Sequence, residues 1–170
     1  GGYWPNALSR GIWAGGSAPS DSNVIDYVTI STTGDATDFG DLITAQSYNA
    51  AAGSFTRSIW GGGQPAGTSL EYVTTMSTGN AADFGDLTRS NIGIGGVSNS
   101  TRALFGGGGT SASTVIDYFT IASVGNTVDF GDLTVARFYL GASSSPTRAI
   151  WAGGQAGTGG SRDNKTEIDY

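Results

Sequence analysis

The sequence predicts an all-β protein made of repeated four-stranded units. Four segments align with one another: RGIWAGG from Arg10, RSIWGGG from Arg57, RALFGGG from Arg102 and RAIWAGG from Arg148, with starts 45 to 47 residues apart. Each is followed by an Ile-Asp-Tyr-like triplet, and the first three triplets are followed in turn by a DFGDL stretch. No segment shows the 3.6-residue apolar period of an amphipathic helix, so we expect essentially no helix.

Each repeat unit is expected to supply four strands in a fixed order. The first is rich in glycine and small residues, as at 92–100 and 139–147, and the second is the RxIWxGG segment. The third is IDYVTIST or its copy, which contains the β-branched and aromatic residues that strands favour. DFGDLT supplies the fourth strand. Tight turns between the third and fourth strands, where a positive φ is often required, are marked by Gly34, Gly79 and Gly125.

A four-stranded unit that is repeated in tandem and buried on both faces is typical of a β-propeller blade. We predict a single repeat array with blades at 1–43, 44–88, 89–134 and 135–170, the last without its outer strand. The chain would then hold about 3.75 blades and form a partial ring, or a ring shared between chains. Four aromatic residues of the second strands are expected to pack between neighbouring blades: Trp13, Trp60, Phe105 and Trp151.

The order of residues within each unit resembles the kelch repeat of galactose-oxidase-like propellers. In that repeat a double glycine ends the second strand and an aromatic residue lies in the fourth, as here. This sequence departs from the pattern with Phe39, Phe84 and Phe130 where kelch repeats commonly have Trp. The copper site of galactose oxidase, which uses Tyr and His, does not carry over, since the chain has no histidine. DFGDL arrays with TTGNA-like turns also resemble repeats of marine bacteriophage structural proteins.

The composition excludes several functions. Eight Lys and Arg against 14 Asp and Glu give a net charge of −6, so the basic patch of a nucleic-acid-binding protein is missing. No apolar run approaches the roughly 20 residues that cross a bilayer, so we expect no membrane insertion. Without Cys or His there is no disulfide, no zinc site of the usual ligands and no His-dependent catalytic triad.

We therefore expect no cofactor and no bound metal. A calcium site at GDATDFGD is the alternative, since Asp35, Asp38 and Asp41 could supply oxygen ligands. Against it, Asn80 and Asn126 replace Asp35 in the other copies, and the stretch has no Glu at its end. Turn-forming Asp and Asn that bond their own backbone are the simpler interpretation.

The three DFGD stretches have a structural interpretation and a catalytic alternative. In a protein kinase an Asp-Phe-Gly run holds magnesium, but that chemistry also needs a glycine-rich nucleotide loop, a paired lysine and a His-Arg-Asp loop. The chain has no histidine, and its only lysine is Lys165. We predict instead that each stretch forms an ion pair with the arginine that begins the second strand of its unit. The expected pairs are Arg10–Asp38, Arg57–Asp83 and Arg102–Asp129.

Two sets of loops vary between the repeat units and are a better guide to function than the shared scaffold. They follow the second and fourth strands, and both should open on the same face of an antiparallel four-stranded unit. Tyr, Asn, Gln and Arg side chains on a rigid frame suit recognition by stacking and hydrogen bonding. The candidate ligand-binding residues are Tyr48, Arg89, Asn91, Arg137, Tyr139, Gln155, Arg162 and Asn164.

These observations favour a non-catalytic propeller module of an extracellular or virion assembly, such as a phage fibre or decoration protein, whose loops bind a cell-surface glycan or protein. The alternative is a purely structural protein that builds a fibre or filament by edge pairing. We expect no enzyme, because a carboxylate glycosidase needs two acids at one pocket, and few acids lie outside the repeated motifs. The chain begins with Gly1 rather than Met, so we expect a processed product or part of a longer protein. Its expected partners are further chain or other copies of itself.

Overall fold

The computed structural model describes residues 10–157 and 163–170, and over these ranges the chain is all-β with antiparallel pairing and no helix. Accordingly, the described part of the chain offers no helix that is long and apolar enough to span a membrane. The expectation of an all-β fold without helix is therefore confirmed for these ranges.

Four antiparallel sheets of three or four strands follow one another along the described chain, and we number them in that order. Sheet 1 contains β1 (Arg10–Ala14), β2 (Ser22–Thr29) and β3 (Thr37–Gln46). Sheet 2 contains β4 (Ala50–Gly53), β5 (Arg57–Gly61), β6 (Gly67–Thr74) and β7 (Ala82–Asn91). Sheet 3 contains β8 (Gly95–Ser98), β9 (Arg102–Gly106), β10 (Ser113–Thr120) and β11 (Val128–Arg137). Sheet 4 contains β12 (Gly141–Ser144), β13 (Ala149–Ala152) and β16 (Ile168–Asp169).

A short hairpin of β14 (Gln155–Ala156) and β15 (Asp163–Asn164) lies between the last two strands of sheet 4 in the sequence. In sheets 2 and 3 the four strands pair in chain order, as the repeat predicts. The small-residue strand expected at the start of each unit is present as β4, β8 and β12. In sheet 1 that strand would fall on residues 1–9, outside the described residues.

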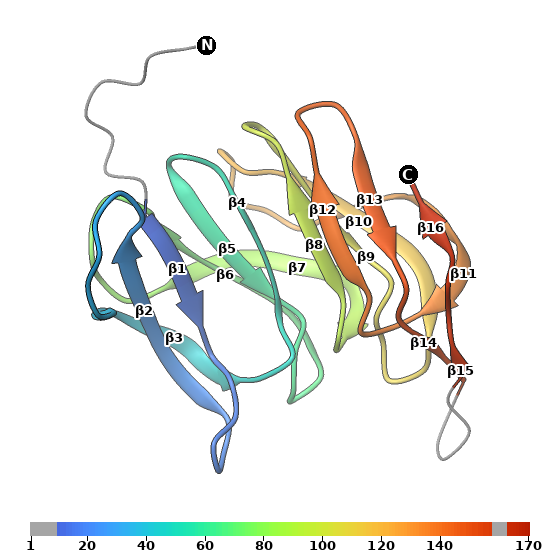
Figure 1. Cartoon of the computed structure of the whole chain (residues 1–170), viewed down its shortest axis with the longest axis horizontal. Coiled ribbons are helices and arrows are strands. Elements are labelled where there is room, and N and C mark those ends of the chain that lie inside the picture. Colours follow the sequence, from blue (N-terminus) through green and yellow to red (C-terminus); the bar gives the residue numbers. More distant parts are fainter. Residues whose placement is uncertain (1–9, 158–162) are drawn as a thin grey trace.

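The sheets lie side by side, and the chain passes through them in order (Figure 1). Neighbouring sheets contact each other along their small-residue strands, with β4 against β8 and β8 against β12. Glycine and alanine at these strands allow the close approach. At Gly96, for example, a Cβ atom would lie only 2.4 Å from the carbonyl oxygen of Ala51 on the neighbouring sheet.

The hydrophobic core lies in the seams between neighbouring sheets. One cluster, around Ile25 and Trp60, joins sheets 1 and 2. A second, around Phe84 and Phe105, joins sheets 2 and 3, and a third, around Trp151, joins sheets 3 and 4. Burial of one such large apolar side chain stabilises the fold by roughly 1.5–3 kcal/mol.

The expectation that second-strand aromatics pack between sheets is confirmed for Trp60, Phe105 and Trp151, which are buried. It is wrong for Trp13, which is 60% exposed. The equivalent aromatics contact the preceding sheet, and the described residues place no sheet in front of sheet 1. Whether the aromatic residue at this position is buried or exposed therefore depends on the presence of a preceding sheet.

Each DFG run forms a β-bulge in the last strand of its sheet. In sheet 1, Asp38 lies opposite Asp26 while Gly40 lies opposite Ile25, so Phe39 is the extra residue. The same shift recurs on β7 and β11. The glycine after each phenylalanine has φ of +147°, +142° and +146° in turn, a conformation that favours glycine. The repeated motif thus encodes a local backbone shape.

The turns between the third and fourth strands agree in part with the prediction. Gly79 and Gly125 have φ of +153° and +150°. Gly34 is not among the glycines with positive φ. Asn follows the two glycines with positive φ, whereas Asp35 follows Gly34.

Candidate ligand-binding face

The two variable loop sets lie on one face of the molecule. After β3, Ser47 N donates a hydrogen bond to Gln64 O (3.0 Å) and Gln64 N donates to Ser47 O (2.6 Å). After β11, Phe138 and Gln155 exchange the same pair of bonds at 2.9 Å each. Each of these linkers between sheets is thus tied to the loop that follows the second strand of the next sheet.

Three equivalent linker residues, Tyr48, Gly93 and Tyr139, are joined by backbone hydrogen bonds. Gly93 N donates to Tyr48 O (3.0 Å), and Tyr139 N donates to Gly93 O (2.8 Å). All three have left-handed backbone, with φ of +55°, +63° and +53°. Glycine adopts this conformation freely, but a tyrosine in it is an uncommon outlier of the kind that clusters at functional sites.

The rings of Tyr48 and Tyr139 contact each other on this face. Their centroids are 5.6 Å apart at an interplanar angle of 50°. Tyr48 is 58% exposed and Tyr139 40% exposed, while the buried ring of Phe138 lies edge-on to Tyr139 at 5.0 Å. Two exposed rings on an ordered backbone offer a stacking surface with polar hydroxyl groups.

Gly93 makes room for this arrangement. A Cβ atom at this position would lie 2.5 Å from Cδ1 of Tyr139, closer than two such atoms can approach. The middle linker therefore needs glycine if the ring of Tyr139 is to lie across it. We refer to Tyr48, Gly93 and Tyr139 as the tyrosine platform.

Polar groups lie beside the platform. An open hollow of about 350 Å³ is lined by Tyr139, Gly154, Gln155, Asn164 and Lys165. Gln155 Nε2 donates to Asn164 Oδ1 (3.2 Å), which joins the two sides of the β14–β15 hairpin. Amide and ammonium groups at this place can bond the hydroxyl groups of a ligand. Of the predicted residues, Tyr48, Tyr139, Gln155 and Asn164 are therefore brought to one area.

Arg89 and Asn91 instead hold sheets 2 and 3 together. Arg89 Nη2 donates to Asn91 Oδ1 and to Gly107 O, both at 3.2 Å. Asn91 is buried, and burial lowers the pKa of Arg89, partly offset by the nearby charges of Asp117 and Asp132. These two side chains lie in the seam between sheets 2 and 3. The structure does not place them on the ligand-binding face, where they were expected. Arg162, also predicted, lies outside the described residues.

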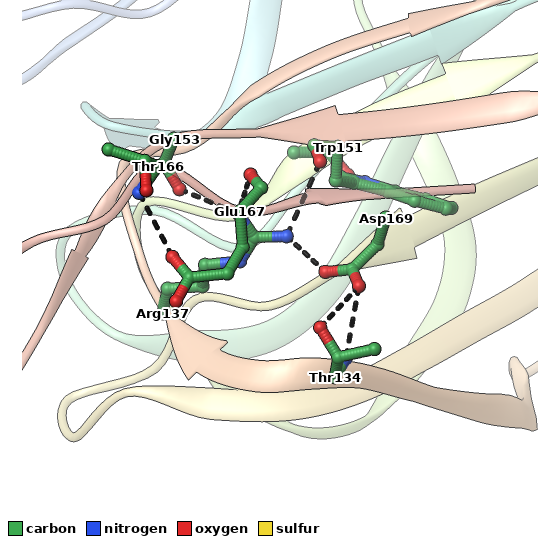
Figure 2. Close-up of polar contacts among 8 residues, drawn as sticks. Thr134, Arg137, Trp151, Gly153, Thr166, Glu167 and Asp169 are labelled. Carbon is green, nitrogen blue, oxygen red and sulfur yellow. Dashed lines mark hydrogen bonds and ion pairs between the residues drawn. The ribbon is translucent and has the colours of Figure 1, made fainter.

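Arg137 is fully buried, so its expected role as a loop residue that contacts ligand is wrong. Its guanidinium forms the only ion pair among the described residues, with Asp169 of sheet 4. It also donates to the carbonyl oxygens of Gly153 (2.9 Å), Glu167 (2.7 Å) and Trp151 (3.3 Å), as Figure 2 shows. A buried charge needs such partners, and here they join β11 to sheet 4.

The acid of each of the last three Ile-Asp-Tyr-like triplets contacts the preceding sheet, which the sequence analysis did not predict. Glu71 accepts from the backbone N–H of Ile43 (2.6 Å) and of Thr44 (3.2 Å) on β3. Asp117 accepts from the hydroxyl of Thr88 on β7 (2.6 Å), and Asp169 from that of Thr134 on β11 (2.5 Å). The signal was present in the sequence, because an acid recurs at one position in every unit although the third strand there is otherwise apolar.

The pKa values of two of these carboxyl groups are shifted in opposite directions. Burial raises the pKa of Glu71, although the N–H groups of Ile43 and Thr44 partly oppose the shift. Burial acts in the same sense on Asp169, but the hydrogen bonds from Thr134 and the charge of Arg137 outweigh it and lower the pKa of Asp169.

The structure gives the repeated arginines partners other than the predicted Asp38, Asp83 and Asp129. Arg10 lies over the ring of Tyr27 at 4.5 Å and donates to Thr75 O of the next sheet (3.0 Å). Arg57 lies over Tyr72 at 4.6 Å and donates to Ile121 O (2.9 Å), and Arg102 lies over Tyr118 at 5.1 Å.

The register explains this correction. Arg10 lies opposite Thr29, whereas Asp38 lies opposite Asp26, three residues away along β2. Three residues of a strand span about 10 Å, so the two side chains start far apart. The Arg10 guanidinium ends over the rings of Tyr27 and Phe39, at 4.5 Å and 5.8 Å from their centroids. Each arginine therefore stacks on a tyrosine of its own sheet, and Arg10 and Arg57 also donate to a backbone carbonyl of the next sheet.

Neither metal chemistry nor a shared acidic centre is supported by the described residues. Over 10–157 and 163–170, no three acids gather closely enough to hold a metal ion. The three DFGD stretches lie on β3, β7 and β11, in three different sheets. The tyrosine platform is thus the candidate site that the geometry favours.

Comparisons with known proteins do not assign the chain to a family. No protein-family model matches the chain, and no curated protein matches it either.

Proposed function

We propose that this chain is a non-catalytic recognition module, built as part of a kelch-like β-propeller, that binds a glycan at the tyrosine platform. We further propose that it belongs to an extracellular or virion assembly such as a phage fibre or decoration structure. It would bind its ligand without chemical conversion.

The propeller arrangement is supported by the repetition of one seam. Sheets with the same strand order follow one another, and their small-residue strands β4, β8 and β12 contact each other in series. Each seam repeats the buried aromatic and the acid that accepts from the preceding sheet. Identical seams rotate each sheet relative to the last by a similar operation, which is how tandem repeats build a ring or a solenoid.

The observation that carries the binding proposal is the tyrosine platform itself. Two tyrosines hold strained left-handed backbone in equivalent linkers, while the third equivalent linker has glycine. The packing between sheets does not require two exposed aromatic side chains at these positions, because Gly93 has the same backbone conformation in the equivalent linker. Sugar rings stack their C–H faces on such aromatics and use hydroxyl groups for hydrogen bonds, which Gln155, Asn164 and Lys165 can complete.

The experiment is binding of the labelled protein to an array of immobilised oligosaccharides, with Tyr48→Gly as the test variant. We expect the array signal to fall at least about tenfold, which corresponds to about 1.4 kcal/mol of lost binding. Since glycine suits a φ of +55°, the variant should melt no lower than the parent protein.

Phe55→Ala is the matched control. Phe55 is 55% exposed and lies in the β4–β5 loop, at the other end of these strands from the platform. Its removal should leave glycan binding unchanged. No array signal for the parent protein, or a signal that Tyr48→Gly leaves intact, would contradict the proposal.

A second candidate, a purely structural protein that associates end to end, is favoured by the two terminal sheets. On sheet 1, Trp13 is 60% exposed and Ile30 is 65% exposed. On sheet 4, Ile168 is 65% exposed and Tyr170 is 83% exposed. The equivalent positions at internal seams are covered, as Ile25 and Ile121 show. Sedimentation of the parent protein beside Trp13→Ser tests it: filaments or closed multimers that the substitution disperses would favour this candidate, and a monomer at all concentrations would exclude it.

A further inference from the structure

The outer edge of a DFGDL strand is covered in the same way at two seams. On β3, Phe39 O accepts from Gly79 N (2.8 Å), and Asp41 O accepts from Ala81 N (2.8 Å). Between these bonds, Asp41 N donates to the side-chain oxygen of Asn80 (3.1 Å). Residues 79–81, from the turn of the next sheet, therefore add a short strand-like segment to β3.

The seam between sheets 2 and 3 repeats this pattern on β7. Gly125 N donates to Phe84 O (2.7 Å) and Thr127 N to Asp86 O (2.8 Å). Asp86 N donates to Asn126 Oδ1 (3.0 Å). Two independent copies thus define one recognition pattern, in which glycine, asparagine and a small residue cover the DFGD edge.

The glycine of DFG is what permits this close approach. A Cβ atom at Gly40 would lie 2.5 Å from Gly79 O, and one at Gly85 would lie 2.3 Å from Gly125 O. At Gly131 of β11 a Cβ atom would meet nothing within 4 Å. The third copy therefore keeps the glycine although no part of the described chain approaches it.

The open edge of β11 has the same local geometry as the two covered edges. Gly131 has φ of +146°, beside +147° and +142° in the covered copies. The ring centroids of Phe130 and Tyr118 are 6.0 Å apart, compared with 5.7 Å and 5.8 Å for the equivalent pairs at the covered edges. Because the edge already has the shape of the covered copies, little reorganisation would precede binding.

A groove borders this edge. It measures about 560 Å³ and is lined by Phe130, Gly131 and Asp132 on the β11 side and by Arg148 and Tyr170 on the sheet 4 side. Phe130 is 54% exposed, whereas Phe84 is 1% exposed under its covering segment. An unpaired strand edge beside an exposed aromatic is a known template for pairing with a peptide.

We propose that the outer edge of β11 is a docking site for an extended peptide segment of the Gly-Asn-Ala or Gly-Asn-Thr type. The glycine N–H donates to Phe130 O, the asparagine side chain accepts from Asp132 N, and the next N–H donates to Asp132 O. Arg102 supplies a fourth contact by donating to the carbonyl four residues before the glycine, as Arg10 and Arg57 do for Thr75 and Ile121. This inference does not depend on the glycan proposal.

The test is titration of the ¹⁵N-labelled chain with a capped synthetic peptide that has the sequence of residues 72–82, YVTTMSTGNAA. At peptide concentrations up to about 5 mM, which detect weak complexes, we expect amide shifts centred on residues 129–133. The same peptide with Asn80→Ala should bind roughly two- to tenfold more weakly, because one hydrogen bond is lost.

Two protein variants locate the site. Gly131→Val should abolish the shifts, since its side chain would occupy the place of the incoming carbonyl. Arg102 is exposed, so Arg102→Ala should leave the fold intact while it weakens binding severalfold, and it tests the proposal even if Gly131→Val folds poorly. Absence of shifts in the parent protein, shifts centred elsewhere, or binding that neither variant changes would overturn the proposal.

Discussion

The outer edges of β7 and β11 carry the same five residues, DFGDL, and meet opposite environments. On β7 the turn of sheet 3 covers the edge, and Phe84 is 1% exposed; on β11 nothing in the described chain covers it, and Phe130 is 54% exposed. The bulge, the φ of the glycine and the packing of phenylalanine on tyrosine are nearly the same in both. The motif therefore fixes its own backbone shape, while the neighbouring sheet decides whether that shape becomes core.

The largest difference should come from removal of the two phenylalanine rings. Phe84→Ala should lower the free energy of unfolding by about 3–5 kcal/mol, because it leaves a cavity in the seam between sheets 2 and 3. Phe130→Ala should cost less than about 1 kcal/mol, since half of the ring is already in water. Urea unfolding of both variants measures the contrast, and equal losses would show that β11 is covered in solution.

A smaller difference should separate the two glycines. Gly85→Ala and Gly131→Ala impose the same strain at φ of +142° and +146°, so their difference isolates the clash with Gly125 O. We expect Gly85→Ala to be more destabilising by about 1–3 kcal/mol, the usual cost of overpacking. The comparison uses the same unfolding assay, and a more damaging Gly131→Ala would refute our account of the seam.

The smallest effect should appear in the pH dependence of two carboxyl groups that join neighbouring sheets. The pKa of Glu71 is raised in the folded protein, so the parent should gain stability relative to Glu71→Gln as pH falls through that pKa towards about 4.3. The pKa of Asp169 is lowered, so the parent should lose stability relative to Asp169→Asn as pH falls below about 3.9. Unfolding curves between pH 3 and 7 check both signs, and parallel curves for either pair would contradict the corresponding shift.

Several features followed from the sequence because each depends on local chemistry or on repetition. Periodic Arg-led segments, glycine turns and β-branched strands predicted the order of strands, and the structure contains it. The loop face also followed, since antiparallel pairing places alternate loops on one side. Tyr48 and Tyr139 were predicted to contact ligand because they lie in loops that differ between repeat units. Their left-handed backbone was not predicted from the sequence.

Other predictions failed because they concern contacts between sheets. Arg10 was expected to pair with Asp38 because the two strands start at the same edge of the sheet, but Asp38 lies opposite Asp26, three residues from the partner of Arg10. Arg137 looked like a loop residue, yet it is buried against Asp169, 32 residues later in the chain. A single sequence carries no direct signal for such pairs, because the geometry that unites them arises only when sheets pack.

By itself the sequence determined the strand order, the glycine turns at Gly79 and Gly125, and the absence of histidine or cysteine chemistry. These depend on backbone preferences and composition, which act within a few residues. Only the tertiary structure decided which DFGDL edge is covered, which arginine is buried and which tyrosines share one surface. Those outcomes depend on the distance between sheets, and burial and pairing energies exist only once a neighbouring sheet is in place.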